Sequence, residues 1–290
     1  ERIVQIAKAK ELDVEKTLKN IFVARAYNAD HQMLLAEKAA EMVHEKNIKL
    51  ILEYDGTNYH GWQSQAGTER PTVQETLERA IRTLDKDAPK TYSSGRTDAG
   101  VHAYGHVVNF HTQSSIPVGA WAPALNHALP DDIRVLLSEE VFPDFHARYS
   151  ALGKTYQYVI LNRSAPSALH RGRAWHIPKK LKLSAMRRGG EHLLGTHDFS
   201  AFRSSGCGAK TPVRNLKALT IKKNGDFIEI KLEADAFLMH MARNIVGTLV
   251  EVGLARFTTG QVKRILDSRD RMSAGKTAPS QGLYLMEVYY

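Results

Sequence analysis

A single carboxylate stands in a short loop whose sequence is SGRTDAGVHA, residues 94–103. It belongs to Asp98, with Arg96 two positions before it and the glycines Gly95 and Gly100 on either side. Glycines allow a ligand or another backbone to approach closely, and an adjacent arginine keeps a buried carboxylate ionised at neutral pH. An ionised, positioned carboxylate is a possible nucleophile. On these residues alone three interpretations of Asp98 stay open: it caps a turn, it pairs with Arg96 as scaffolding, or it performs chemistry.

Other combinations of reactive residues are incomplete. His102 and His106 have the spacing of a metal pair on a helix, but their context predicts a strand and no neighbouring carboxylate completes a metal motif. The fragment GAKT at 208–211 has alanine where a phosphate-binding loop needs glycine before lysine. The fragment AGKT at 274–277 places Asp270 where the first glycine belongs. We therefore expect no metal and no nucleotide cofactor.

Basic and aromatic residues alternate in three places, RY at 148–149, KTYQY at 154–158 and HRGRAWH at 170–176. Cations that contact phosphates and rings that stack on bases suit unstacked nucleotides. The plainer interpretation is a solvated basic face with Tyr158 and Trp175 in the core. Since Tyr156 and Tyr158 fall on the same side of a predicted strand, we expect one in the core and the other at its open end.

The composition is that of a globular chain of 290 residues with a basic balance. Its 40 Lys and Arg against 31 Asp and Glu give a formal charge of +9, which favours nucleic acid as a partner before an anionic membrane. A generally basic surface is the plain alternative. Cys207 is the only cysteine, which excludes an internal disulfide and fits a cytoplasmic location. No apolar run approaches the ~20 residues of a membrane span.

The elements that must position these residues occur in two similar sets. The first set is a strand at 48–54, a helix from the capping box at Thr72 to Leu84, a strand at 101–112, a helix at 117–128 and a strand at 133–141. A basic, irregular link at 145–151 follows. The second set has strands at 153–161, 216–222, 227–232 and 283–289, and helices at 184–194, at 240–253 and from 259. We expect the hairpin to turn at Asn224-Gly225. The pattern predicts an α+β fold.

The loop at 94–103, with EYDGTNYHGWQ at 53–63 and FHARYSALGKTYQY at 145–158, resembles the TruA family of tRNA pseudouridine synthases. Later segments agree, namely DFSAFR at 198–203, TPVRN at 211–215, HMARNIVG at 240–247 and EVG at 251–253. The resemblance implies two related ferredoxin-like halves, 48–148 and 149–290, in one extended mixed sheet with helices on one face and a central cleft. It implies a homodimer that binds tRNA and converts uridine to pseudouridine at positions 38–40 of the anticodon stem-loop without a cofactor.

The same resemblance implies roles for five residues. Asp98 matches the family nucleophile, and Arg96 matches the arginine that pairs with it and helps displace the target base. Tyr156 matches the tyrosine that stacks on the flipped uracil, Arg243 an arginine that lines the cleft, and Arg148 an RNA contact. The reaction breaks the N1–C1′ bond and rejoins the uracil through C5, so a carboxylate beside the sugar can stabilise the electron-poor C1′. Attack at C1′, attack at C6 and passage through a glycal all stay open.

Residues 1–47 fall outside that resemblance. Their pattern predicts a helix, a strand and a second helix. The segment 18–35 is similar to part of the archaeal RadA recombinases. The phosphate loop and the second nucleotide-binding strand that flank this segment in RadA are both missing. We expect a fusion whose first 47 residues act on neither ATP nor DNA.

Three classes of function therefore compete. The first is a tRNA pseudouridine synthase, and the second is a non-catalytic tRNA-binding protein or folding chaperone on the same scaffold. Asp98 and Tyr156 favour catalysis, because a pure binder needs neither. The third class, a recombinase fragment, depends only on residues 1–47 and would lose its function on their removal.

Overall fold

The computed structural model describes residues 25, 27–35, 45–64, 70–88 and 90–290. The chain forms two compact units, Glu1–Glu45 and Lys46–Tyr290. Residues 29–35 of the first unit are helical, and most of the helix, strand and helix predicted for 1–47 lies outside the described residues. The second unit begins two residues before the predicted strand at Ile48, because Lys46 and Asn47 already pair with Thr112 and His111.

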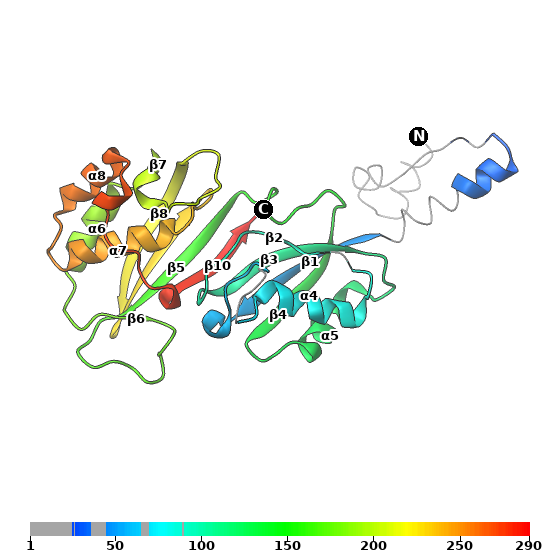
Figure 1. Cartoon of the computed structure of the whole chain (residues 1–290), viewed down its shortest axis with the longest axis horizontal. Coiled ribbons are helices and arrows are strands. Elements are labelled where there is room, and N and C mark those ends of the chain that lie inside the picture. Colours follow the sequence, from blue (N-terminus) through cyan, green and yellow to red (C-terminus); the bar gives the residue numbers. More distant parts are fainter. Residues whose placement is uncertain (1–24, 26, 36–44, 65–69, 89) are drawn as a thin grey trace, which may run out of the picture. The chain divides into compact units, whose positions relative to one another are not determined.

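Within its described residues, Lys46–Tyr290 contains one mixed sheet of ten strands (Figure 1). The strands are β1 Lys46–Tyr54, β2 Tyr92–Ser93, β3 His102–Thr112, β4 Ile133–Val141, β5 Gly153–Leu161, β6 Trp175–His176, β7 Gly195–Asp198, β8 Val213–Asn224, β9 Phe227–Ala234 and β10 Leu283–Tyr289. Their order is β4-β1-β3-β10-β5-β9-β8-β7, with β2 beside β3 and β6 beside β5. This confirms the expected α+β class with one extended mixed sheet.

Helices cover both ends of this sheet. Those of the first half are α4 Val73–Leu84 and α5 Trp121–Ala128, and those of the second are α6 Leu183–Glu191, α7 Met241–Gly253 and α8 Thr259–Ser268. Thr72 caps α4 in the predicted capping box with Glu75. Apolar side chains between helices and strands form the core, as where Trp121 of α5 meets Phe110 of β3 edge to face at 5.1 Å between ring centroids.

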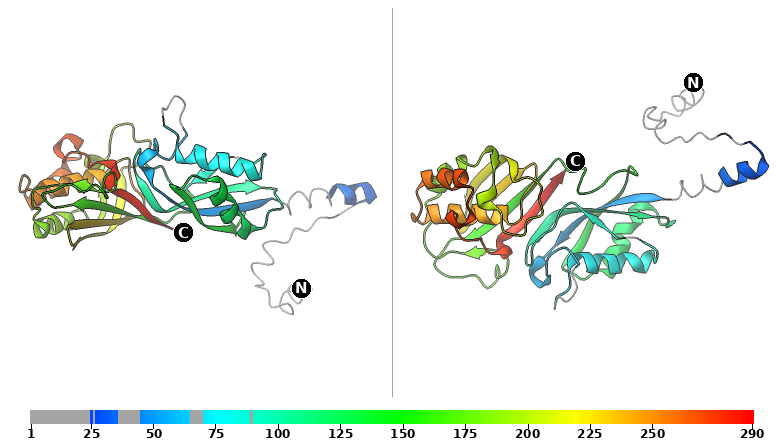
Figure 2. Two further views of the ribbon diagram at one scale, coloured as in Figure 1. Left: turned by 90° about the horizontal axis from the view of Figure 1, so that it is seen from below. Right: turned by 45° about the horizontal axis from the view of Figure 1, so that its top comes forward.

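The last strand, β10, joins the two halves. It runs parallel to β3, where Tyr284 lies opposite His102, and antiparallel to β5, where Leu285 lies opposite Tyr156. Figure 2 shows β10 in red between the strands of the two halves. Because β3 follows the loop of Asp98 and β5 carries Tyr156, this pairing fixes the two candidate residues relative to each other.

Local details depart from the sequence-based expectations. The hairpin turn consists of Gly225 and Asp226, because Asn224 still pairs with Phe227; Gly225 takes the positive φ of 56°. The helix predicted over 117–128 begins as a 3-10 turn at Val118–Ala120. The short strands β2, β6 and β7 were not predicted. Among the described residues, no helix is both long enough and apolar enough to span a membrane.

Small residues in α7 let a neighbouring loop lie directly on the helix. A Cβ atom at Gly247 would lie 1.8 Å from the carbonyl oxygen of Lys276, and one at Gly275 would lie 2.8 Å from the Cα of Thr248. The Gly275 N–H donates to Thr248 Oγ1 at 3.0 Å. This close approach holds residues 275–278 against the helix that carries Arg243.

Substitution of Gly247 by alanine should therefore destabilise the protein by at least about 2 kcal/mol, because the backbone that the new methyl group meets has to shift. A methyl group at Gly260 of α8 would have no neighbouring atom within 4 Å, so Gly260→Ala is the matched control. It should be neutral or stabilising by up to ~1 kcal/mol. Urea unfolding measures both, and equal stability of the two variants would contradict the close contact.

Candidate active site

The loop of Asp98 is held by the segment that follows β1. The Trp62 N–H donates to the carbonyl oxygen of Thr97 at 3.0 Å, and the Tyr54 hydroxyl lies 2.8 Å from Thr97 Oγ1. Gly61 has a φ of 84°, and a side chain there would place a Cβ atom 2.5 Å from the Thr97 carbonyl oxygen. The motif at 53–63 therefore fixes the backbone directly beside Asp98.

Two side chains from the start of α7 face the Asp98 carboxylate. Arg243 Nη1 donates to Asp98 Oδ2 at 2.7 Å, and His240 Nε2 lies 3.4 Å from the same oxygen. Burial raises the pKa of Asp98, but the hydrogen bonds and charges of His240 and Arg243 outweigh it and hold that pKa below the ordinary value. The carboxylate is ionised at neutral pH, yet 32% of the side chain stays exposed. It is charged and accessible from outside.

The first turn of α7 places both of these partners. Arg243 Nε donates to the carbonyl oxygen of Ala278 at 2.7 Å, and the Ala278 N–H donates to the carbonyl oxygen of Arg243 at 3.1 Å. His240 caps the helix with a φ of 60°, a conformation that costs a non-glycine residue of the order of 1 kcal/mol. Its Nδ1 lies 2.7 Å from the hydroxyl of Ser204. The strained backbone directs the His240 ring at Asp98.

Tyr156 stands beside this ion pair on β5. Its side chain is buried and meets Phe237 edge to face at 4.9 Å between ring centroids. Burial raises the pKa of Tyr156, and the negative charge of Asp98 raises it further, so the hydroxyl keeps its proton. Tyr158, two residues on, is fully buried, and its hydroxyl donates to the carbonyl oxygen of Pro279 at 2.7 Å. Both tyrosines therefore lie in the core, Tyr158 the more deeply, and the expectation that one of them stands at its open end is wrong.

The expected pairing of Arg96 with Asp98 is wrong for this structure. Arg96 is exposed, and among the described residues no ion pair joins the two side chains. The Asp98 side chain turns to α7 instead, where Arg243 takes the role of its partner. Sequence proximity suggested the wrong arginine, because a loop residue two positions away points into solvent.

Arg148 lies near the base of the same loop. It is exposed, with its guanidinium carbon 5.7 Å from the centroid of the Tyr149 ring. Close by, Lys154 Nζ donates to the carbonyl oxygen of Ser94, at the start of the Asp98 loop. Burial, together with the charge of Arg148, lowers the pKa of Lys154 to about 8. The Lys154 side chain thus joins β5 to the Asp98 loop by a hydrogen bond.

The two histidines of β3 have protein partners. His102 accepts a hydrogen bond from the Gly56 N–H at 3.1 Å, and its other nitrogen lies 3.0 Å from the carbonyl oxygen of Gly172. His106 stacks on Trp62 at 4.1 Å between ring centroids, and burial lowers its pKa to about 3. In the part of the chain that the structure describes, no group of three His, Cys, Asp or Glu residues is placed to hold a metal ion.

Two residues beside the site, His240 and Phe237, were not singled out from the sequence. Lys154 was named in the basic and aromatic run at 154–158, but its contact with the Asp98 loop was not predicted. His240 stands in HMARNIVG, three residues before Arg243, which is the spacing of neighbours on one helix face. Lys154 stands two residues before Tyr156 in KTYQY, on the same side of the strand. The spacings of His240 from Arg243 and of Lys154 from Tyr156 could have predicted that these residues lie beside the site. No sequence pattern pointed to Phe237.

A family model and several similar proteins all point to the tRNA pseudouridine synthases. A family model described as tRNA pseudouridine synthase matches residues 50–150 and 191–290. A protein named tRNA pseudouridine synthase A from Acetivibrio thermocellus is 50% identical over 245 residues, which are 84% of this chain and all of that protein. Proteins of the same name from Thermoanaerobacter sp. and Rhodospirillum centenum are 47% and 45% identical, over 84% and 83% of this chain and 100% and 98% of their own lengths.

A solved chain from a Cbf5–Nop10–Gar1 complex aligns with 86% of this chain and 50% of its own length, at 12% identity and a TM-score of 0.37. That likeness is too low to support an argument. None of these matches supports the similarity of residues 1–47 to RadA.

The buried Lys154 predicts a dependence of stability on pH. The unfolded chain keeps this proton to about pH 10.5, whereas the folded protein releases it near pH 8. Between these values the unfolded state binds more protons, so the free energy of unfolding rises with pH. Between pH 8 and 10 the wild type should gain about 2 kcal/mol relative to Lys154→Met.

Urea unfolding of both proteins across this pH range measures the difference. Lys179→Met, which replaces an exposed lysine, is the control and should follow the wild type. Parallel stability curves for the wild type and Lys154→Met would show that Lys154 has an ordinary pKa.

Proposed function

The chain belongs to the tRNA pseudouridine synthase family, and we propose that it isomerises uridine to pseudouridine at positions 38–40 of the tRNA anticodon stem-loop, with Asp98 as nucleophile. One observation carries the role of Asp98: its carboxylate is held ionised by Arg243 and His240, and remains partly exposed at the junction of the two halves. A charged oxygen in that position has access to the sugar or base of a flipped nucleotide.

The reaction leaves the elemental composition of the uridine unchanged. The N1–C1′ bond breaks, the uracil turns, C5 bonds to C1′, and the proton of C5 is lost while N1 gains one. Asp98 serves this sequence by stabilising or trapping the electron-poor C1′, as the second carboxylate of a retaining glycosidase does. Addition to C6 and removal of the 2′ proton are the alternatives that the same carboxylate allows. The chemistry involves no net oxidation and no hydrolysis.

Other residues around Asp98 then have separable roles. Tyr156 offers a ring beside the carboxylate, supported edge to face by Phe237, on which a flipped uracil stacks. Its raised pKa keeps the hydroxyl a donor. Arg96, exposed on the Asp98 loop, is placed to contact the RNA or to occupy the space that the base leaves. Arg148 adds a positive charge at the same loop for a phosphate.

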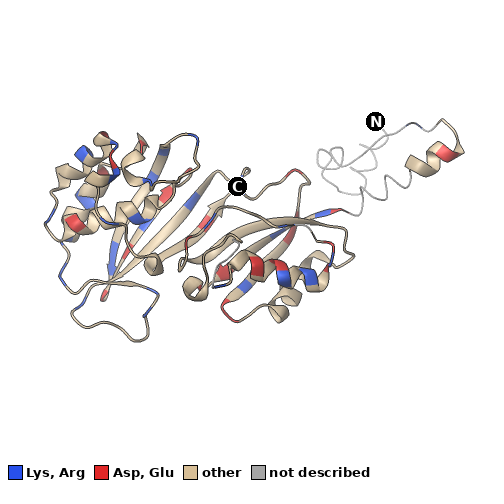
Figure 3. Cartoon of the chain, in the orientation of Figure 1, with Lys and Arg blue, Asp and Glu red and all other residues tan. Residues whose placement is uncertain are grey.

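The surface of the second half supports RNA as the partner. Lys and Arg recur along β8, which carries Arg214, Lys217, Lys222 and Lys223 (Figure 3). Such cations supply the phosphate contacts that dominate RNA affinity. We also propose a homodimer in the cytoplasm, as the family resemblance and the single cysteine suggest. The proposed halves, 48–148 and 149–290, share one sheet. That residues 1–47 form an inert, RadA-like extension stays a prediction.

Tritium release from a tRNA transcript labelled at C5 of uridine measures the reaction directly. The wild type should release tritium, and Asp98→Asn should be slower by roughly a thousandfold or more, because the neutral amide is no nucleophile. Asp267→Asn is the control, since Asp267 is an exposed carboxylate on α8 and should leave the rate unchanged.

Full activity of Asp98→Asn would remove Asp98 from the reaction. Tight tRNA binding by the wild type without any tritium release would instead favour the non-catalytic tRNA-binding protein.

A further inference from the structure

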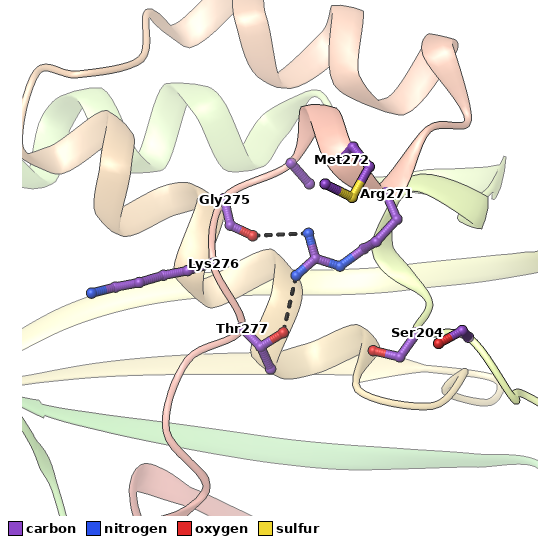
Figure 4. Close-up of a pocket in the computed structure, with 8 residues that line it drawn as sticks. Ser204, Arg271, Met272, Gly275, Lys276 and Thr277 are labelled. Atoms are coloured by element: carbon purple, nitrogen blue, oxygen red, sulfur yellow. Dashed lines mark hydrogen bonds between the residues drawn. The ribbon is translucent and has the colours of Figure 1, made fainter.

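A cavity of about 360 Å³ adjoins the site on the side of α7. Ser204 and Ser205 line one wall, and the loop from Arg271 to Thr277 lines the other (Figure 4). Its volume lies in the range of small-ligand sites and exceeds what a single ion needs. Both walls lie next to residues that contact Asp98 or its partners, so a ligand here would be close to the reacting nucleotide.

The cavity carries a positive charge without a counter-ion. The Arg271 guanidinium donates to the carbonyl oxygen of Gly275, to Asn244 Oδ1 and to Thr277 Oγ1, each at 3.0 Å. All three acceptors are neutral, and among the described residues no carboxylate is within ion-pair distance of Arg271. Burial lowers the pKa of Arg271, as expected of a cation that lacks an anionic partner.

The nearest acid in sequence, Asp270, does not neutralise this charge. Its carboxylate accepts hydrogen bonds from the Met272 N–H and the Ser273 hydroxyl, at 3.0 and 2.9 Å. Lys276 adds a second cation at the rim; in Figure 4 it points away from Arg271, and its Nζ lies 5.4 Å from the centroid of the Trp175 ring. Arg271 and the hydroxyls of Ser204 and Ser205 are donors suited to an anion, whereas the Thr277 hydroxyl already donates to Asn244 Oδ1 at 2.7 Å.

Two short paths connect the cavity to Asp98. Ser204 bonds His240, which faces the carboxylate, and Thr277 precedes Ala278, whose carbonyl oxygen accepts from Arg243. The ribose of a reacting uridine has a phosphodiester on each side. A nucleotide at Asp98 therefore brings one of its two flanking phosphates within reach of the cavity.

We propose that this cavity is a phosphodiester subsite, in which Arg271 and the hydroxyls of Ser204 and Ser205 hold the RNA phosphate on one side of the target uridine. The inference rests on the proposed function, since it assigns the position of that same substrate. A nucleoside triphosphate is a poorer occupant despite the GKT sequence at 275–277. The Gly275 N–H that a phosphate loop would offer is already donated to Thr248.

The test uses the full chain and an anticodon stem-loop RNA that contains one target uridine. Ser205 is exposed, so Ser205→Asp places a carboxylate at the mouth of the cavity without disturbing the core. Ser205→Asn has nearly the same shape without the charge. We expect Ser205→Asp to bind the RNA about tenfold more weakly than Ser205→Asn in low salt. Ser115→Asp adds the same charge at an exposed site of the first half and should bind like the wild type.

Neutral methylphosphonates at the two phosphates that flank the target identify the contact. At one of the two positions the wild type should lose about tenfold in affinity, and Ser205→Asp should lose less than about twofold, because its contact is already weakened. Equal binding by Ser205→Asp and Ser205→Asn, or equal methylphosphonate penalties in wild type and Ser205→Asp, would overturn the subsite while leaving catalysis intact. A wild type that binds this RNA but forms no pseudouridine would overturn the proposed function, and the subsite with it.

Discussion

The ion pair between Asp98 and Arg243 is the interaction on which the site depends. It joins residues 145 positions apart in the chain at 2.7 Å, from the first half to α7 of the second. A half-buried carboxylate without a partner would take up a proton or turn to solvent. With Arg243 and His240 beside it, the carboxylate is both charged and held in place. The two halves each supply one side of this pair, so neither half alone forms the site.

The fold meets this constraint by rigid backbone contacts. β10 pairs with β3 on one side and β5 on the other, which fixes the loop of Asp98 relative to Tyr156. Close approaches at Gly61 and Gly247 place backbone against backbone where a side chain would intrude. The same packing that holds residues 275–278 on α7 leaves the charge of Arg271 facing a cavity rather than a carboxylate. The candidate site at Asp98 and the cavity of the proposed subsite are thus consequences of one arrangement.

Local features were predictable from the sequence, and long-range ones were not. The capping box at Thr72, the alternation of β1 and the period of α7 are encoded by neighbours within one or two turns. Asp98, Tyr156 and Arg243 were found through motifs, and the structure brings all three together. The partner of Asp98 was misassigned to Arg96, because pairing across the halves depends on where β10 inserts. Two-residue strands such as β6 are too short to show the alternation of buried and exposed residues that predicts a strand. They are defined only by their pairing with a neighbouring strand, which for β6 is β5.

The pKa of the Asp98 carboxyl group, before and after removal of its partner, tests the central claim most directly. Carbon-detected NMR titration of the free protein measures it in the wild type and in Arg243→Met, with Asp98→Asn to assign the signal. The ion pair predicts a wild-type pKa below the ordinary value of about 3.9. In Arg243→Met that pKa should be higher than in the wild type, because one of the two groups that lower it is gone. An ordinary pKa that is the same in both proteins would contradict a carboxylate held ionised by Arg243.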